Sequence, residues 1–155
     1  MVEARDMPVP VMGLFVVVVL ALAIKAGLAR DWLDSPVVSA AEQMLAAMPD
    51  DYFAIKPADA NQEIAEGQAL VIDVREPAEF ATEHIAAARS IPLRQLAKMI
   101  DTLPDRRAAP IVVYCRSGYR GAVALTILRM AGYTNVRNVI GGFEGWKAVG
   151  LPAGR

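Results

Sequence analysis

Residues 111–120 have the sequence IVVYCRSGYR. The first four are apolar without alternation, which is typical of a strand covered on both faces in a parallel sheet. Cys115 follows at the carboxyl end of this strand, and Ser117-Gly118 suits a tight turn. A helix is then expected from about Gly121 to Ala131. Ligands of open α/β sheets bind at the carboxyl ends of the strands, so this stretch predicts a functional loop.

The loop carries one thiol between two arginines. Cys115 is the only cysteine of the chain, and Arg116 and Arg120 follow it. The amides of such a loop point inward and bind an anion, and the positive end of the following helix reinforces them. That field stabilises a thiolate, and no acidic residue lies between Asp105 and Glu144. Packing as a small apolar residue is the alternative role for Cys115, but the pattern favours a nucleophilic sulfur in an anion cradle.

The rest of the chain alternates predicted strands and helices. The other strands are expected at Tyr52–Ile55, Leu70–Val74, Arg89–Ile91 and Val136–Ile140. Helices are expected from a capping box at Ser39–Glu42 after a linker containing Pro36, after Pro57, after Pro77, over Leu93–Leu103, and after Gly141-Gly142. The core-facing residues are predicted to be Val123, Ile127 and Met130 in the helix after the cysteine loop, and Phe143 and Trp146 in the last helix. This βαβα order predicts a doubly wound α/β domain, a parallel sheet with helices on both faces.

Five separated motifs, in this order, give the chain a resemblance to the rhodanese-like sulfurtransferases. They are Val71–Glu76, Phe80–Ile85, Ser90–Leu93, Cys115–Arg120 and Gly141–Trp146. The resemblance covers roughly residues 53 to 152. It implies a sulfurtransferase whose Cys115 takes a sulfur atom as a persulfide from a donor such as thiosulfate. The persulfide would then pass its sulfur to a thiophilic acceptor, either cyanide or a thiol.

The expected site follows the cysteine loop. Cys115 is the catalytic residue, and the substrate-binding residues are Arg116, Ser117, Gly118, Tyr119 and Arg120. Arg116 and Arg120 are the candidates for holding an anion such as thiosulfate. The resemblance implies that Asp73 and Arg75 brace the loops by ion pairing. Because the chain has no second cysteine, an outside acceptor must discharge the sulfur from Cys115.

One turn departs from the family's usual pattern. The family usually has Gly before the His and Pro-Gly after the Ile, whereas this chain has Glu83 before His84 and Ala86-Ala87 after Ile85. His84, the single histidine, is expected to serve this turn structurally rather than to pair with the cysteine. One Cys and one His cannot close a tetrahedral shell, so neither a metal nor another cofactor is predicted.

Two other classes of function share parts of this pattern. A cysteine phosphatase or arsenate reductase also uses a thiolate in an amide cradle, but it needs an arginine after five intervening residues, whereas Arg120 follows Cys115 after four. A non-catalytic persulfide carrier or binding module, serving a membrane partner, would share every residue with the enzyme. Only a measurement of activity separates the carrier from the enzyme.

The amino end has a different composition. The chain is 55% hydrophobic with a formal net charge of −1, which gives no electrostatic footprint for nucleic acid. From Met7 to Ile24 no residue is charged, and about 18 such residues can span a bilayer. We expect an uncleaved single-pass anchor. A signal peptide cleaved near Gly27–Ala29, or a core helix, is the alternative.

Two segments are therefore expected. Residues 1–34 form the anchor or signal segment with its linker, and residues 35–155 form the rhodanese-like domain. Lys25 and Arg30 after the apolar run slightly favour a cytoplasmic domain. The resemblance to exported single-domain rhodaneses favours the extracytoplasmic side, which is the expectation adopted. The protein partner and the oligomeric state are left open by the sequence.

Overall fold

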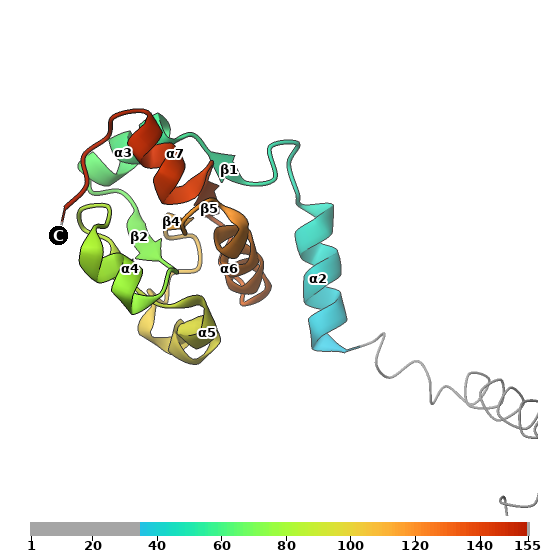
Figure 1. Cartoon of the computed structure of the whole chain (residues 1–155). Coiled ribbons are helices and arrows are strands. Elements are labelled where there is room, and N and C mark those ends of the chain that lie inside the picture. Colours follow the sequence, from blue (N-terminus) through green and yellow to red (C-terminus); the bar gives the residue numbers. More distant parts are fainter. Residues whose placement is uncertain (1–34, 155) are drawn as a thin grey trace, which may run out of the picture. The chain divides into compact units, whose positions relative to one another are not determined.

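A computed structural model describes residues 35–154 of the chain (Figure 1). Its centre is one parallel sheet of five strands in the order β1-β5-β4-β2-β3. The strands are β1 (Ala54–Ile55), β2 (Leu70–Asp73), β3 (Arg89–Ser90), β4 (Ile111–Tyr114) and β5 (Val136–Val139). Every strand predicted from the sequence is present, although several are one or two residues shorter than expected.

Strand β4 lies in the middle of the sheet. It pairs with β2 on one side, where Val71 lies opposite Val112, and with β5 on the other, where Ile111 lies opposite Val136. All four of its residues are buried, as the unbroken apolar run predicted. The carboxyl end of β4 therefore lies in the middle of the row of strand ends, and Cys115 is the next residue.

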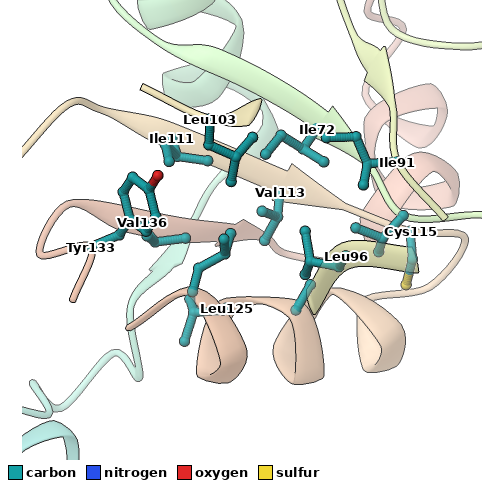
Figure 2. Packing of buried hydrophobic residues seen from close by; sticks show 13 residues of the cluster. Ile72, Ile91, Leu96, Leu103, Ile111, Val113, Cys115, Leu125, Tyr133 and Val136 are labelled. Atoms are coloured by element: carbon teal, nitrogen blue, oxygen red, sulfur yellow. The ribbon is translucent and has the colours of Figure 1, made fainter. Parts of the chain in front are cut away.

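Helices cover both faces of the sheet. They are α3 (Pro57–Ala65), α4 (Pro77–Thr82), α5 (Leu93–Leu96), which continues as the 3-10 helix η2 (Ala97–Thr102), α6 (Tyr119–Met130) and α7 (Gly142–Ala148). Successive residues of a strand point to opposite faces, and two separate buried clusters result. Val113 packs with Leu96 and Leu125 on one face (Figure 2), whereas Val112 packs with Phe143 and Trp146 on the other. The doubly wound α/β prediction is confirmed.

The helix after the cysteine loop differs from its prediction. It begins at Tyr119 rather than near Gly121, and its buried residues are Gly121, Ala124, Leu125 and Leu128. Of the three predicted core residues, Ile127 is partly buried and packs against the core, Met130 is partly buried, and Val123 is 50% exposed, so the prediction was wrong at Val123. The cause is close packing against β5, because a Cβ on Gly121 would lie 2.1 Å from the Oδ1 of Asn138. The small residues Gly121 and Ala124 therefore face the core together with Leu125 and Leu128.

The first described helix also starts earlier than predicted. Helix α2 spans Pro36–Ala46, and the Oγ of Ser35 accepts a hydrogen bond from the amide of Val38 at 3.3 Å. Ser39 lies inside this helix, so the cap is Ser35 and not the predicted Ser39. Pro36, placed in a linker by the sequence, is the first residue of the helix, a position that suits proline.

The turn that departs from the family pattern keeps a glycine-like backbone. Ala87, where the family usually has Gly, has φ 62°, one of three positive values at non-glycine residues between 35 and 154. Glu83 has an extended backbone, and its carbonyl accepts a hydrogen bond from the Nη2 of Arg75 at 2.7 Å. His84 exchanges two backbone hydrogen bonds with Gly154, each 2.8 Å long. The turn therefore keeps a backbone conformation that suits glycine, and Ala87 adopts the left-handed region to allow it.

Within residues 35–154, none of the helices combines the length and apolar character that crossing a membrane requires. The predicted anchor, Met7–Ile24, lies outside the described residues. The sheet and helices α3 to α7 belong to one compact unit that begins at Gln43.

Replacing the strained alanine should stabilise the domain. A left-handed backbone costs an L-residue about 1–2 kcal/mol, and glycine loses about 0.4–1 kcal/mol through its freer unfolded chain. Ala87→Gly should therefore raise the free energy of unfolding by roughly 0.5–1 kcal/mol in urea titrations. Ala86→Gly, at an exposed neighbour without positive φ, is the matched control and should lower it. A loss of stability in both variants would contradict the strain at Ala87.

Candidate active site

The sulfur of Cys115 sits at the amino end of helix α6. Gly118, the N-cap residue of this helix, has φ 106°, and its amide donates a hydrogen bond to the Sγ of Cys115 at 3.2 Å. The positive end of a 12-residue helix thus faces the thiol. Cys115 is only 1% exposed, so a reactant reaches its sulfur through the loop and not from open solvent. An amide donor and the positive end of a helix are thus both directed at the sulfur.

The loop backbone is held by the first turn of α7. The amide of Phe143 donates to the carbonyl of Cys115 at 2.7 Å, and the amide of Glu144 donates to that of Arg116 at 2.9 Å. The approach is so close that a Cβ on Gly142 would lie 2.4 Å from the Cys115 carbonyl oxygen. On the other side, the Nδ2 of Asn138 donates to the carbonyl of Gly118 at 3.1 Å. The cysteine loop is therefore fixed by two neighbouring elements, β5 and α7.

Both arginines of the loop have carboxylate partners. The guanidinium of Arg120 makes two hydrogen bonds to Glu79 of α4, at 2.8 and 3.0 Å, and each side chain is about one-third exposed. Arg116 donates through Nε to Glu144 of α7 at 2.7 Å on a more exposed surface. The sequence showed no acid near the loop, yet the fold brings one to each arginine. The mouth of the site is therefore close to neutral rather than strongly positive.

The Arg120–Glu79 pair lies beside the sulfur. Hydrogen bonding to Arg120 is the main reason why the pKa of Glu79 falls to about 2, so this carboxylate is ionised at neutral pH. The same hydrogen bond raises the pKa of Arg120, and the Cys115 side chain raises it further by charge and hydrogen bonding. Arg120 is therefore paired with a carboxylate and lies in the same loop as the thiol. It is the loop cation placed to act on a group attached to the sulfur.

The two other side chains of the predicted set face outward. Tyr119 is 83% exposed, and Ser117 is also exposed. Neither side chain makes a hydrogen bond within the part of the chain that the structure describes. The contribution of these positions to an anion cradle would come from their backbone amides. Substrate binding by the loop residues stays a prediction.

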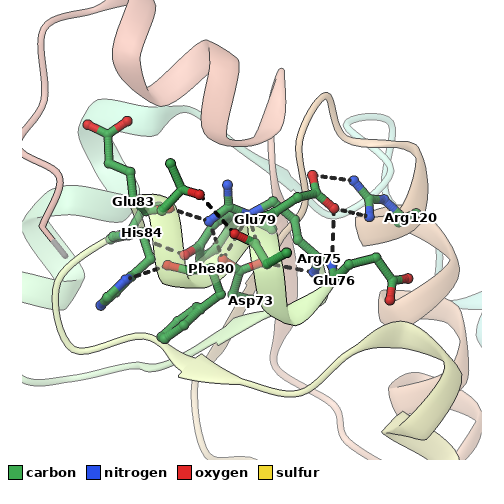
Figure 3. Close-up of polar contacts among 12 residues, drawn as sticks. Asp73, Arg75, Glu76, Glu79, Phe80, Glu83, His84 and Arg120 are labelled. Atoms are coloured by element: carbon green, nitrogen blue, oxygen red, sulfur yellow. Dashed lines mark hydrogen bonds and ion pairs between the residues drawn. The ribbon is translucent and has the colours of Figure 1, made fainter.

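The Asp73–Arg75 pair lies beneath the loops (Figure 3). The Nε and Nη2 of Arg75 bond to the carboxylate of Asp73 at distances between 2.6 and 3.0 Å, and both residues are buried. The guanidinium carbon also lies 4.3 Å from the ring centre of Phe143. These contacts join the end of β2 to the turn after α4 and to α7. They have the geometry of a brace, the role that the resemblance implied.

His84 is engaged away from this loop. Its Nδ1 lies 3.0 Å from the carbonyl oxygen of Phe80, and the two rings stack with centres 3.9 Å apart. In the described part of the chain, no three His, Cys, Asp or Glu residues are grouped so that they could hold a metal ion.

Sequence analysis missed three residues of the site. Glu79 and Glu144 pair with the arginines from 41 and 28 positions away, and Asn138 holds Gly118 from β5. Glu79 had a visible but different signal: it forms a capping box with Glu76 at the start of α4. Glu144 lies within the Gly141–Trp146 motif. Nothing in a single sequence marked either carboxylate as an arginine partner.

The comparisons with known proteins agree with this geometry. Residues 56–149 match the family model of the rhodanese-like domain. The thiosulfate sulfurtransferase GlpE of Pseudomonas aeruginosa is 34% identical over a segment covering 66% of this chain and 90% of that protein. A rhodanese-related protein from Thermoplasma volcanium has a crystal structure that matches with a TM-score of 0.60 and 33% identity, covering 66% of this chain and 98% of that one.

A third relative is longer than this chain. An uncharacterized protein of Synechocystis is 42% identical over 83 residues, which cover 54% of this chain and 45% of that protein. The match with this chain therefore spans less than half of that relative.

Gly142 should tolerate no side chain. Gly142→Ala combines a positive φ of 58° with a Cβ 2.4 Å from the Cys115 carbonyl, so we expect it to lower the free energy of unfolding by about 3 kcal/mol and to alter the alkylation rate of Cys115. Gly150→Ala is the matched control, because Gly150 has φ 73° but no atom within 4 Å of the added Cβ. It should lose about 1–2 kcal/mol and leave alkylation unchanged. Equal effects in the two variants would show that α7 does not fix the loop.

Proposed function

Because the chain belongs to the rhodanese-like domain family, we propose that it is a sulfurtransferase working through a persulfide on Cys115. Sulfane sulfur comes from a donor such as thiosulfate and leaves to cyanide or a thiol. The observation that carries this proposal is the 3.2 Å hydrogen bond from the Gly118 amide to the Sγ of Cys115 at the amino end of α6. Such a contact directs a hydrogen-bond donor at the sulfur that would act as the nucleophile.

In the first step the Cys115 thiolate attacks the outer sulfur of thiosulfate. A bond forms between Sγ and that sulfur, the sulfur–sulfur bond of thiosulfate breaks, and sulfite leaves with the bonding electron pair. The acceptor then attacks the transferred sulfur. The bond between that sulfur and Sγ breaks, and its electron pair returns to Sγ as a thiolate. No external oxidant is needed in either step.

Loop amides and Arg120 would stabilise the negative charge of the donor and of the persulfide. Arg120 supports this role because it interacts with the Cys115 sulfur, and its planar guanidinium can grip two oxygens at once. Its pairing with Glu79 sets a condition: a donor anion has to share Arg120 with a carboxylate already in place. Arg116, mostly exposed, would contribute less.

The pairing of both arginines also supports a second function. A mouth with little net charge attracts a dianion such as thiosulfate weakly, whereas it does not repel a sulfur atom delivered on a thiol. A persulfide carrier that receives sulfur from another thiol and passes it to a partner would use the same Cys115 and the same loop.

The intermediate is testable by intact mass. After incubation with thiosulfate, the full-length chain should gain the mass of one sulfur atom and lose it on addition of cyanide. Cys115→Ser should do neither, because it lacks the nucleophile. A sulfur adduct on the Ser variant would overturn the assignment. Loading from an organic persulfide but not from thiosulfate would favour the carrier.

The same assay tests whether Arg120 holds the donor through its guanidinium geometry or only through its positive charge. Arg120→Lys keeps the positive charge but loses the two-oxygen grip, so loading from thiosulfate should slow by about tenfold or more while Cys115 is still alkylated. Equal loading would show that Arg120 does not hold the donor.

We further propose that the chain is anchored in a membrane by Met7–Ile24, with the domain on the extracytoplasmic side. The uncharged run and its length support the anchor. The protein should then stay in the membrane fraction through high-salt and carbonate washes, because apolar burial is not screened by salt. A soluble product beginning near Arg30 would indicate a cleaved signal instead. Protease added outside the cytoplasmic membrane should digest the domain, and full protection would place it in the cytoplasm.

A further inference from the structure

A pocket of about 330 Å³ opens beside the cysteine loop, between α4 and α7. Its volume suits a small organic molecule. Charged side chains from β2's end, α4, the loop and α7 line it: Arg75, Glu79, Glu83, Arg116, Glu144 and Lys147. The ring of Phe143 supplies an apolar wall. Cys115 is not among the lining residues, so the pocket lies next to the sulfur rather than around it.

Arg75 gives the pocket an anchoring point for a carboxylate. The residue is only 4% exposed, and its hydrogen bonds to Asp73 and Glu83 use Nε and Nη2. Nη1 makes no hydrogen bond with residues 35–154, and it is not fully buried. Because Arg75 lines the pocket, we take Nη1 as the donor that this buried guanidinium has free for a ligand there. A buried cationic donor of this kind favours an anionic oxygen.

The remaining charges balance one another. The Nζ of Lys147 lies 3.0 Å from Glu83, and Arg116 bonds to Glu144. With three cations and three carboxylates in the lining, the pocket has no net attraction for a dianion. A ligand that carries one carboxylate and one ammonium group finds a partner for each. The pairs at the rim are exposed enough to exchange partners with such a ligand.

The pocket is connected to the sulfur through one ion pair. Glu79 lines the pocket and holds Arg120, which belongs to the same loop as Cys115. Arg116, another lining residue, is the next residue after Cys115. A thiol group extending from a molecule bound in the pocket would therefore arrive at the mouth of the cysteine loop.

We propose that this pocket binds the sulfur acceptor, and that the acceptor is a small thiol bearing both a carboxylate and an ammonium group. The inference rests on the proposed persulfide chemistry. The carboxylate binds Arg75 Nη1 with help from Lys147, and the ammonium group binds Glu83. The acceptor's thiolate attacks the outer sulfur of the Cys115 persulfide, a new sulfur–sulfur bond forms, and the electron pair of the broken bond returns to Sγ.

Four thiols of similar size test this chemistry on the sulfur-loaded, full-length chain. They are cysteine with both charges, 3-mercaptopropionate with a carboxylate, cysteamine with an ammonium group, and neutral 2-mercaptoethanol. Discharge rates are compared per thiolate concentration as kcat/KM. Cysteine should exceed 2-mercaptoethanol by about tenfold, the factor that two exposed charge contacts provide.

Two variants should shift the preferences in opposite ways. Lys147→Met should lower the ratio of 3-mercaptopropionate to 2-mercaptoethanol by about fivefold, and Glu83→Gln should lower the ratio of cysteamine to 2-mercaptoethanol by a similar factor. Lys98→Met, an exposed lysine outside the pocket lining, is the matched control and should shift neither ratio. These ratios cancel changes in the persulfide's own reactivity.

The outcomes separate this inference from the proposed function. Loading by thiosulfate and discharge by cyanide, with the four thiols equal, would overturn the inference and leave the sulfurtransferase standing. If no persulfide forms at all, the proposed function fails, and the pocket is tested by calorimetric titration of the unloaded chain with S-methylcysteine. Binding that Lys147→Met weakens would support the pocket's ligand class, and no binding would overturn it.

Discussion

The buried ion pair between Asp73 and Arg75 is the interaction on which the site depends. A buried guanidinium without its carboxylate would cost about 3–5 kcal/mol, so the pair fixes where Arg75 lies. From there Arg75 holds the carbonyl of Glu83 and lies against the ring of Phe143. The amide of Phe143 in turn holds the carbonyl of Cys115. A continuous series of contacts therefore runs from the end of β2 to the backbone of Cys115.

Charge at the site is set by the fold rather than by the loop. The loop alone is cationic, with Arg116 and Arg120 flanking the turn, but α4 and α7 each contribute a carboxylate to it. The sulfur is then surrounded mainly by directed groups, the Gly118 amide and the end of α6, and less by net charge. Directed amides keep their effect in salt better than exposed charges do. A neutral mouth also leaves selection among reactants to their shape and to paired charges.

Features that depend on neighbouring residues in the sequence could be predicted, whereas features that depend on contacts between distant residues could not. Strand β4 and Cys115 at its end were predictable, because an unbroken apolar run followed by turn residues is a local pattern. The buried face of α6 was not, because Gly121 and Ala124 face the sheet through their small size, which a search for branched apolar residues overlooks. The arginine partners were equally hidden, since Glu79 lies 41 positions from Arg120 and only the fold joins them. Resemblance to a family supplied the chemistry that neither pattern contains.

Glu79 occupies the boundary between the two parts of the site. It belongs to the pocket lining and also fixes Arg120 beside the sulfur, so a change at Glu79 would disturb donor and acceptor together. Lys147 and Glu83 bond to each other and line the pocket without bonding to the loop. A variant that changes discharge of the sulfur without changing its loading therefore has to be made at Lys147 or Glu83 and not at Glu79. If a donor anion draws Arg120 away, Glu79 loses the hydrogen bond that holds its pKa near 2 and becomes an unpaired carboxylate facing the pocket. Arg120 can return to Glu79 once sulfite has left, so the charge of the pocket wall is restored before the acceptor binds at Glu83 and Lys147.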